Sequence, residues 1–144
     1  MKLIRFGAPG AEKPGLILGD GARVDASAFG SDWDERFLGS DGLLRLEAWA
    51  REHAASLPRV PESERLGPCI PRPSKIVCIA LNNRALDAVK IKAPTDHPAF
   101  FLKPFTALTG HLQPIELRRA FGLTHPEPEL GVIYNGKVVK TVDF

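Results

Sequence analysis

A cluster of prolines divides the sequence into two parts. Between Leu57 and Pro73 the chain carries five prolines among charged residues: Pro58, Pro61, Pro68, Pro71 and Pro73. Because proline lacks a backbone N–H and fixes φ, such a stretch resists both helix and sheet and is typical of a semi-rigid connector. In a chain of 144 residues this predicts two small domains, residues 1–70 with the connector and residues 71–144.

The first part has the pattern of a small β-meander with one helix. Strands are expected at Lys2–Phe6, Gly15–Leu18 and Ala22–Val24, the last two joined by a turn containing Asp20-Gly21. An Asp-Gly pair favours a tight hairpin because glycine tolerates a positive φ.

The predicted helix begins at Ser40 or Asp41, either of which can cap it, and runs to about Ala54. Apolar residues recur along it at three- and four-residue spacing: Leu43, Leu46, Trp49 and Ala50. This spacing indicates a packed face rather than a cofactor site.

The second part reads as short strands. They are expected at Ile76–Leu81, Ala99–Leu102, Ile115–Leu117, Glu129–Tyr134 and Lys137–Val142. The first is continuously apolar, as in a strand buried on both faces, and Asn135-Gly136 predicts a hairpin between the last two. With 13 Gly and 13 Pro, the chain is predicted to be mainly β (α+β).

The charge balance argues against two classes of partner. A net charge of +2, from 19 basic and 17 acidic residues, lacks the basic excess expected for binding nucleic acid or an anionic membrane. No apolar run is long enough for a membrane span, and no signal-peptide pattern follows the first residues. We therefore expect a cytoplasmic protein that binds neither nucleic acid nor membrane.

Glu127-Pro128-Glu129 is the clearest candidate metal-binding pattern. In an extended segment, carboxylates at i and i+2 leave the same face of the chain and repel each other unless a cation lies between them. Mg²⁺ or Mn²⁺ suits such a pair, because these ions accept one or two carboxylates together with waters and substrate oxygens. The same three residues also fit a solvated loop, which is the commoner occurrence of this pattern.

Other polar residues follow apolar strands. Lys103 follows Phe100-Phe101-Leu102 and is expected either to bind an anionic substrate or to extend into solvent. Asn82, after the strand expected at Ile76–Leu81, is placed to bind a ligand or to serve a turn. Of the four histidines, only His125 lies near the Glu pair in the sequence.

Taken in order, these segments resemble the fumarylacetoacetate hydrolase family, in particular its bacterial acylpyruvate, diketo-deoxy-sugar-acid and ureidoglycolate-type branch. The likeness is carried by Arg72-Pro73-Ser74-Lys75-Ile76-Val77-Cys78-Ile79-Ala80-Leu81-Asn82, Pro98-Ala99-Phe100-Phe101-Leu102-Lys103-Pro104, Thr106-Ala107-Leu108, Gly110, Pro114-Ile115-Glu116-Leu117 and Glu127-Pro128-Glu129-Leu130-Gly131-Val132-Ile133. Residues 1–7 and 12–15 look like the small N-terminal domain of that branch.

The resemblance implies a rolled β-sheet catalytic domain, usually dimeric, of which residues 71–144 form the first part. It implies that Glu127 and Glu129 hold Mg²⁺ or Mn²⁺ with an Asp from a later strand. Lys103 and Asn82 become substrate-binding candidates. The implied activity is that of a metal-dependent hydrolase or lyase that cleaves small 2-keto or diketo acids. In this reaction the metal stabilises the enolate left by bond cleavage.

Two departures from the family pattern bear on activity. The family's His-x-x-Glu pair falls on Leu86 and Val89, and an aliphatic side chain cannot transfer a proton. His97 and Asp87 are the nearby residues able to substitute.

The second departure is the position of Phe144, which is the last residue and lies before the family's third metal ligand. We therefore expect a C-terminally truncated family member. Two hypotheses follow: an enzyme whose site is completed by another chain or by oligomerisation, and a catalytically impaired binding or oligomerisation module. The strand expected at Lys137–Val142 would present an edge for pairing, so a homo-oligomer is predicted.

Overall fold

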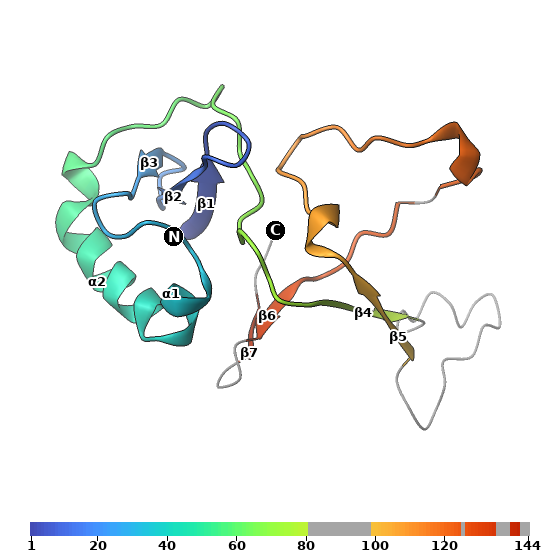
Figure 1. The fold of residues 1–144 in the computed structure, drawn as a ribbon. Helices are drawn as coiled ribbons and strands as arrows, with labels where there is room; N and C mark the ends of the chain where they lie inside the picture. Colours follow the sequence, from blue (N-terminus) through green and yellow to red (C-terminus); the bar gives the residue numbers. More distant parts are fainter. Residues whose placement is uncertain (81–98, 125, 135–138, 142–144) are drawn as a thin grey trace. The chain divides into compact units, whose positions relative to one another are not determined.

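The computed structural model describes residues 1–80, 99–124, 126–134 and 139–141 (Figure 1). The chain separates into two compact units, one made of residues 1–71 and 109–144 and the other of residues 72–108. The division predicted at residues 70 and 71 stays a prediction. The described residues form short antiparallel sheets with few helices, which confirms the mainly β (α+β) fold class. The rolled sheet implied by the resemblance also stays a prediction.

The predicted N-terminal meander is present. Strands β1 (Lys2–Phe6), β2 (Lys13–Ile17) and β3 (Arg23–Asp25) form an antiparallel sheet in the order β1-β2-β3. In the turn after β2, Gly21 has φ of 84°, a conformation that glycine adopts without steric cost. The Asp20 carboxylate accepts a hydrogen bond from the Ala22 N–H at 3.0 Å, as expected of an Asp-Gly turn.

Two α-helices pack beside this sheet (Figure 1). The predicted helix is α2 (Gly42–His53), in which Leu46 and Ala50 are buried. Asp41 is its N-cap residue, although the side chain makes no capping hydrogen bond. A short helix that was not predicted, α1 (Glu35–Gly39), precedes it and is capped by Asp34, whose carboxylate accepts from the Phe37 N–H at 2.8 Å.

The core of the N-terminal part has two clusters. Helix and sheet residues form the larger one: Leu16, Val24, Ala26, Trp33, Phe37, Leu46, Ala50 and Leu57. The smaller one contains Ile4, Phe6, Val60 and Leu66. The smaller cluster draws half of its members from the proline-rich connector, so the connector belongs to the folded core.

The connector lies along both edges of the N-terminal sheet. Next to β3, the Asp25 N–H donates to the Pro58 carbonyl and the Val60 N–H donates to the Arg23 carbonyl, both at 2.9 Å. Next to β1, the Gly67 N–H donates to the Arg5 carbonyl at 2.8 Å. Residues 57–73 form no helix and only isolated bridges, because proline tolerates an edge position but not a central strand.

The unit of residues 72–108 contains an antiparallel pair of strands, β4 (Ile76–Ala80) and β5 (Ala99–Lys103), and the 3₁₀ turn η2 (Phe105–Ala107). The prediction of a strand buried on both faces is wrong for β4, because Val77 and Ile79 are exposed. The reason is that, within the described residues, β4 and β5 form a two-stranded sheet with no layer over that face.

In residues 109–141 the structure shortens or removes predicted strands. Ile115–Leu117 is not a strand and is exposed, because this Ile-Glu-Leu segment finds no partner strand among the described residues. Beyond the short 3₁₀ turn η3 (Arg119–Phe121), strands β6 (Val132–Tyr134) and β7 (Val139–Thr141) pair antiparallel, as predicted. The Asn135-Gly136 turn between them lies outside the described residues.

Candidate functional site

The predicted carboxylate pair lies just before β6. That strand begins at Val132 rather than at Glu129, so Glu127 and Glu129 stand in a segment without helix or strand. Both residues are exposed. Among the described residues, no three His, Cys, Asp or Glu side chains gather closely enough to hold a metal ion. The two exposed carboxylates can therefore supply oxygen ligands to a hard cation. The third ligand implied by the resemblance has no counterpart in the described residues.

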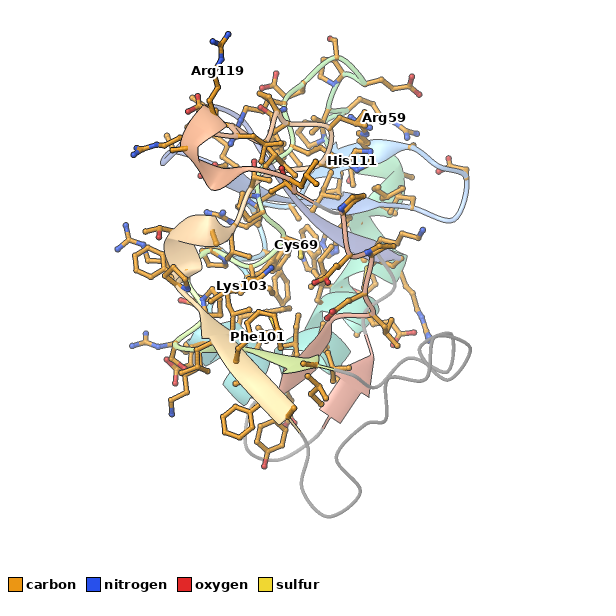
Figure 2. All side chains as sticks on the ribbon, turned by 90° about the vertical axis from the view of Figure 1, so that its right-hand side faces the viewer. Arg59, Cys69, Phe101, Lys103, His111 and Arg119 are labelled. Atoms are coloured by element: carbon orange, nitrogen blue, oxygen red, sulfur yellow. The ribbon has the colours of Figure 1, made fainter. Side chains whose placement is uncertain are left out.

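Lys103 is the final residue of β5, and its side chain is exposed (Figure 2). Its Nζ lies 5.7 Å from the centroid of the Phe101 ring, which belongs to the residue two positions earlier on the same face of the strand. In the same unit the Arg72 guanidinium lies 5.9 Å from the Phe105 ring centroid. Neither cation forms a salt bridge within the described part of the chain. Both remain able to bind a carboxylate.

Six of the residues named in the sequence analysis lie outside the described residues: Asn82, Leu86, Asp87, Val89, His97 and His125. Of the two substrate-binding candidates, Lys103 is therefore described and Asn82 is not.

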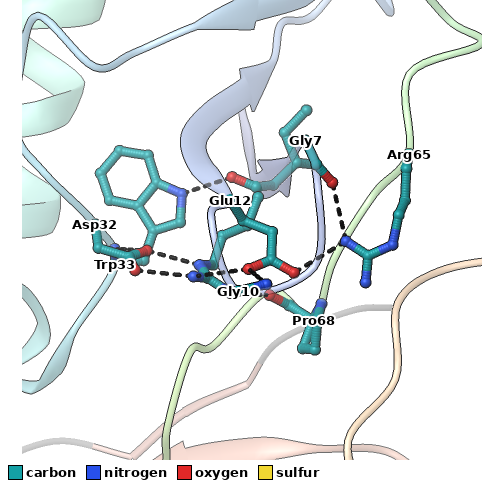
Figure 3. Close-up of polar contacts among 9 residues, drawn as sticks. Gly7, Gly10, Glu12, Asp32, Trp33, Arg65 and Pro68 are labelled. Atoms are coloured by element: carbon teal, nitrogen blue, oxygen red, sulfur yellow. Dashed lines mark hydrogen bonds and ion pairs between the residues drawn. The ribbon is translucent and has the colours of Figure 1, made fainter.

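Sequence reasoning missed a polar cluster around Arg5 in the N-terminal sheet. Figure 3 shows its members Glu12, Asp32 and Arg65. The guanidinium donates to both oxygens of Asp32, from Nε at 2.7 Å and from Nη2 at 3.0 Å. Its Nη2 lies 3.6 Å from Oε2 of Glu12, and its Nη1 donates to the Pro68 carbonyl at 3.3 Å. The Arg5 and Glu12 side chains are 8% and 7% exposed, so both charges are largely removed from water.

Glu12 links Arg5 to the connector. Its Oε1 accepts from Arg65 at 2.9 Å, and the same Arg65 nitrogen donates to the Gly7 carbonyl at 3.0 Å. Its Oε2 accepts from the Gly10 N–H at 3.1 Å. Burial alone would raise the pKa of Glu12, but the Arg65 hydrogen bond and the two guanidinium charges outweigh it and hold the pKa below its ordinary value.

The signal for this cluster was present in β1. Arg5 lies between the buried apolar residues Ile4 and Phe6 of β1, and a charge in such a position requires a partner. No buried side-chain polar atom of the described residues lacks a hydrogen-bond partner, so the role of the cluster is structural: it fastens the loop after β1 and the connector to the sheet.

The comparisons with known proteins concern the second part of the chain most directly. Residues 75–143 match the family model described as Fumarylacetoacetate (FAA) hydrolase C-terminal. A protein of Burkholderia multivorans named "Putative hydrolase" is 36% identical over 143 residues, which is 99% of this chain and 49% of that protein. Proteins of the same description from Burkholderia cenocepacia and Burkholderia lata are 34% identical over the same shares.

The chain thus spans about half the length of the curated relatives it matches. No helix among the described residues is long and apolar enough to cross a membrane. The match of residues 75–143 and the Burkholderia relatives together support the fumarylacetoacetate hydrolase family for this chain.

Proposed function

We propose that this chain contributes to a metal-dependent hydrolase or lyase of the bacterial acylpyruvase, diketo-acid and ureidoglycolate lyase-like branch, acting on small 2-keto or diketo acids. The observation that carries the proposal is the exposed Glu127 and Glu129 pair within the segment that matches the family model. The matched segment also contains Lys103.

The chemistry of the donors fits Mg²⁺ or Mn²⁺. Two carboxylates two residues apart, in a segment whose backbone is not part of a sheet or helix, supply hard oxygen ligands. A divalent ion held there would act as a Lewis acid toward the keto-acid end of the substrate.

Lys103 would hold the substrate's carboxylate. Its exposed ammonium has no ion-pair partner in the described residues and lies 5.7 Å from the centroid of the Phe101 ring. The aliphatic residues Leu86 and Val89 transfer no proton, so the proton must pass through another group or through water.

Metal binding is the first test. Titration of Mg²⁺ or Mn²⁺ into the purified chain, followed calorimetrically, should show a site that Glu127→Gln with Glu129→Gln weakens by about ten-fold or more. Glu116→Gln, at another exposed carboxylate of the same unit, should leave the affinity unchanged. A metal affinity equal in the double variant and the wild type would contradict the proposed site.

Turnover is the second test. Hydrolysis of an acylpyruvate in the presence of either metal ion, lost in the double variant, supports the enzymatic function. Metal binding without turnover would favour the second candidate, a binding or oligomerisation module, which the exposed apolar residues of β4 and β5 support.

A further inference from the structure

Residues 65–68 of the connector lie along the edge of β1, and we call them the strap. Two backbone hydrogen bonds join the strap to β1: from the Gly7 N–H to the Arg65 carbonyl at 3.0 Å, and from the Gly67 N–H to the Arg5 carbonyl at 2.8 Å. Between these hydrogen bonds Leu66 forms an antiparallel bridge with Phe6, and its side chain is buried in the smaller core cluster. The backbone attachment of the strap is therefore short.

Side chains reinforce this attachment, and they meet at the Glu12 carboxylate (Figure 3). The Arg65 guanidinium, which belongs to the strap, donates to Glu12 Oε1 at 2.9 Å. The Arg5 guanidinium lies 3.6 Å from Glu12 Oε2 and donates to the Pro68 carbonyl of the strap at 3.3 Å. A Cβ added to Gly67 would come within 2.8 Å of Glu12 Oε1. The strap thus lies directly against the Glu12 side chain, which is 7% exposed.

Loss of the Glu12 charge acts mainly on the strap. Arg5 keeps a second carboxylate, since it donates two hydrogen bonds to Asp32. Arg65 pairs with no carboxylate other than Glu12 in the part of the chain that the structure describes. A neutral Glu12 would leave the half-buried Arg65 cation without a counter-charge, next to a second cation that contacts the same side chain. Opening the strap returns the Arg65 cation to water and relieves this cost.

The neighbouring chain allows the strap to open by itself. Before the strap, Val60 is attached separately at the opposite edge of the sheet, where its N–H donates to the Arg23 carbonyl at 2.9 Å. Residues 61–63 between the two attachments are exposed. On the other side of the strap, Gly110 packs so closely against the Leu66 carbonyl that an added Cβ would collide with it. Within the described residues this contact adds packing but no hydrogen bond.

We propose that the strap opens as one unit while β1, β2 and β3 stay paired, and that the ionised Glu12 carboxylate holds it closed. Local openings that expose little apolar surface have smaller free energies than global unfolding. Residue 71 is the last one before the unit of residues 72–108, so an open strap lengthens the free chain that leads into that unit. The inference goes beyond the proposed function, because it requires neither metal nor turnover.

Amide hydrogen exchange of the full chain, followed for each residue by NMR at neutral pH, tests the opening. The Gly7 and Gly67 amides should share one opening constant, larger than that of the Ala26 amide, which donates to the Pro14 carbonyl in the core. Low urea should accelerate exchange at Ala26 and leave Gly7 and Gly67 unchanged, because the local opening exposes little surface. One opening constant and one urea dependence for all three amides would overturn the inference.

A matched pair of variants tests the role of Glu12. Glu12→Gln should raise the opening constant at Gly7 and Gly67 by about ten-fold or more at neutral pH, because a charged hydrogen bond to Arg65 is lost. Glu62→Gln changes an exposed carboxylate of the same connector that forms no ion pair within the described residues, and it should leave the opening constant unchanged. No effect of Glu12→Gln, or equal effects of the two substitutions, would contradict the inference.

Acid should open the strap of the wild type. The groups that face the Glu12 carboxylate are the guanidinium groups of Arg5 and Arg65 and the Gly10 N–H, and they keep their charge state in acid. As the pH falls through the lowered pKa of Glu12, the opening constant of wild type, corrected for intrinsic exchange, should rise toward that of Glu12→Gln. Asp32, which faces Arg5, is present in both proteins, so the comparison isolates Glu12. A ratio of the two opening constants that stays the same at every acidic pH would overturn the inference.

Discussion

At the scale of single residues, the stability of the N-terminal part depends on ion pairs among a few buried and half-buried charged side chains. Arg5 engages Asp32 through two hydrogen bonds, and Glu12 joins Arg5 to Arg65. Ion pairs of this kind stabilise little relative to apolar packing, but removing one partner leaves an uncompensated buried charge. The individual members should therefore be sensitive to substitution even though the cluster is not catalytic.

Glu12→Gln should destabilise the protein by about 1.5–3 kcal/mol, because an amide has one acceptor oxygen where the carboxylate has two and the two guanidinium groups lose their shared anion. Urea unfolding followed by tryptophan fluorescence measures this change. Glu47→Gln is the control: its partner Arg51 lies four residues along α2 and both side chains are exposed, so the loss should be about 0.5 kcal/mol or less. Equal losses in the two variants would contradict the structural role of Glu12.

The same residue predicts a pH dependence. The pKa of Glu12 is lower in the folded chain than its ordinary value of 4.5, so the folded state favours the ionised form. Its contribution to the free energy of unfolding is complete above that ordinary value and is lost as the pH falls through the lowered pKa. Urea unfolding at a series of acidic pH values should show wild type losing more stability than Glu12→Gln. Parallel curves for the two proteins would refute this.

At the scale of elements, local sequence and close packing act together in the meander. Gly15 lies at the centre of β2, where an added Cβ would come within 2.9 Å of both the Phe6 ring and the Val24 carbonyl oxygen. The carbonyl belongs to the backbone of β3 and cannot move aside without disturbing the sheet. The spacing of the three strands therefore requires a residue without a side chain at this position.

Gly15→Ala should cost about 1–3 kcal/mol, the usual range for forcing an extra methyl group into a packed core. The midpoint of urea unfolding measures it. Gly19→Ala serves as the control, since no atom lies within 4 Å of a Cβ added there. A Gly15→Ala protein as stable as the control would show that the sheet adjusts freely at this point.

At the scale of the whole molecule, the chain combines a well-packed N-terminal core with strands β4, β5 and β6, which expose much of their apolar surface. In β4 and β5 the exposed residues include Val77, Ile79, Phe100 and Leu102, and β6 and β7 form another short two-stranded sheet. Within the described residues, β7 pairs only with β6. A strand with an unpaired edge favours pairing with another chain.

We therefore predict that the purified chain forms dimers or larger species through β7. Light scattering across a dilution series should show a molecular mass that falls as the protein is diluted. Phe100→Asp should not change this association, because Phe100 lies in β5 and not at the edge of β7. A monomer at tens of micromolar would contradict the prediction.

Local patterns were sufficient where a segment's structure depends on its own residues. The spacing of Leu46 and Ala50 predicted α2, and Asp20-Gly21 predicted the turn in which Gly21 adopts a positive φ. The pairing of β6 and β7 was predicted from Asn135-Gly136 between two expected strands. The function of Glu127 and Glu129 was inferred from a resemblance and stays a proposal.

Only the tertiary structure decided which distant groups meet. The prolines between Leu57 and Pro73 predicted a connector, but only folding placed it along β3 and β1, because edge hydrogen bonds depend on where the sheet ends. Arg5 marked a charge needing a partner, but not that Asp32, 27 residues away, would supply it. The apolar sequence of β4 predicted burial, yet Val77 and Ile79 are exposed, since burial depends on a covering layer and not on the strand's own composition.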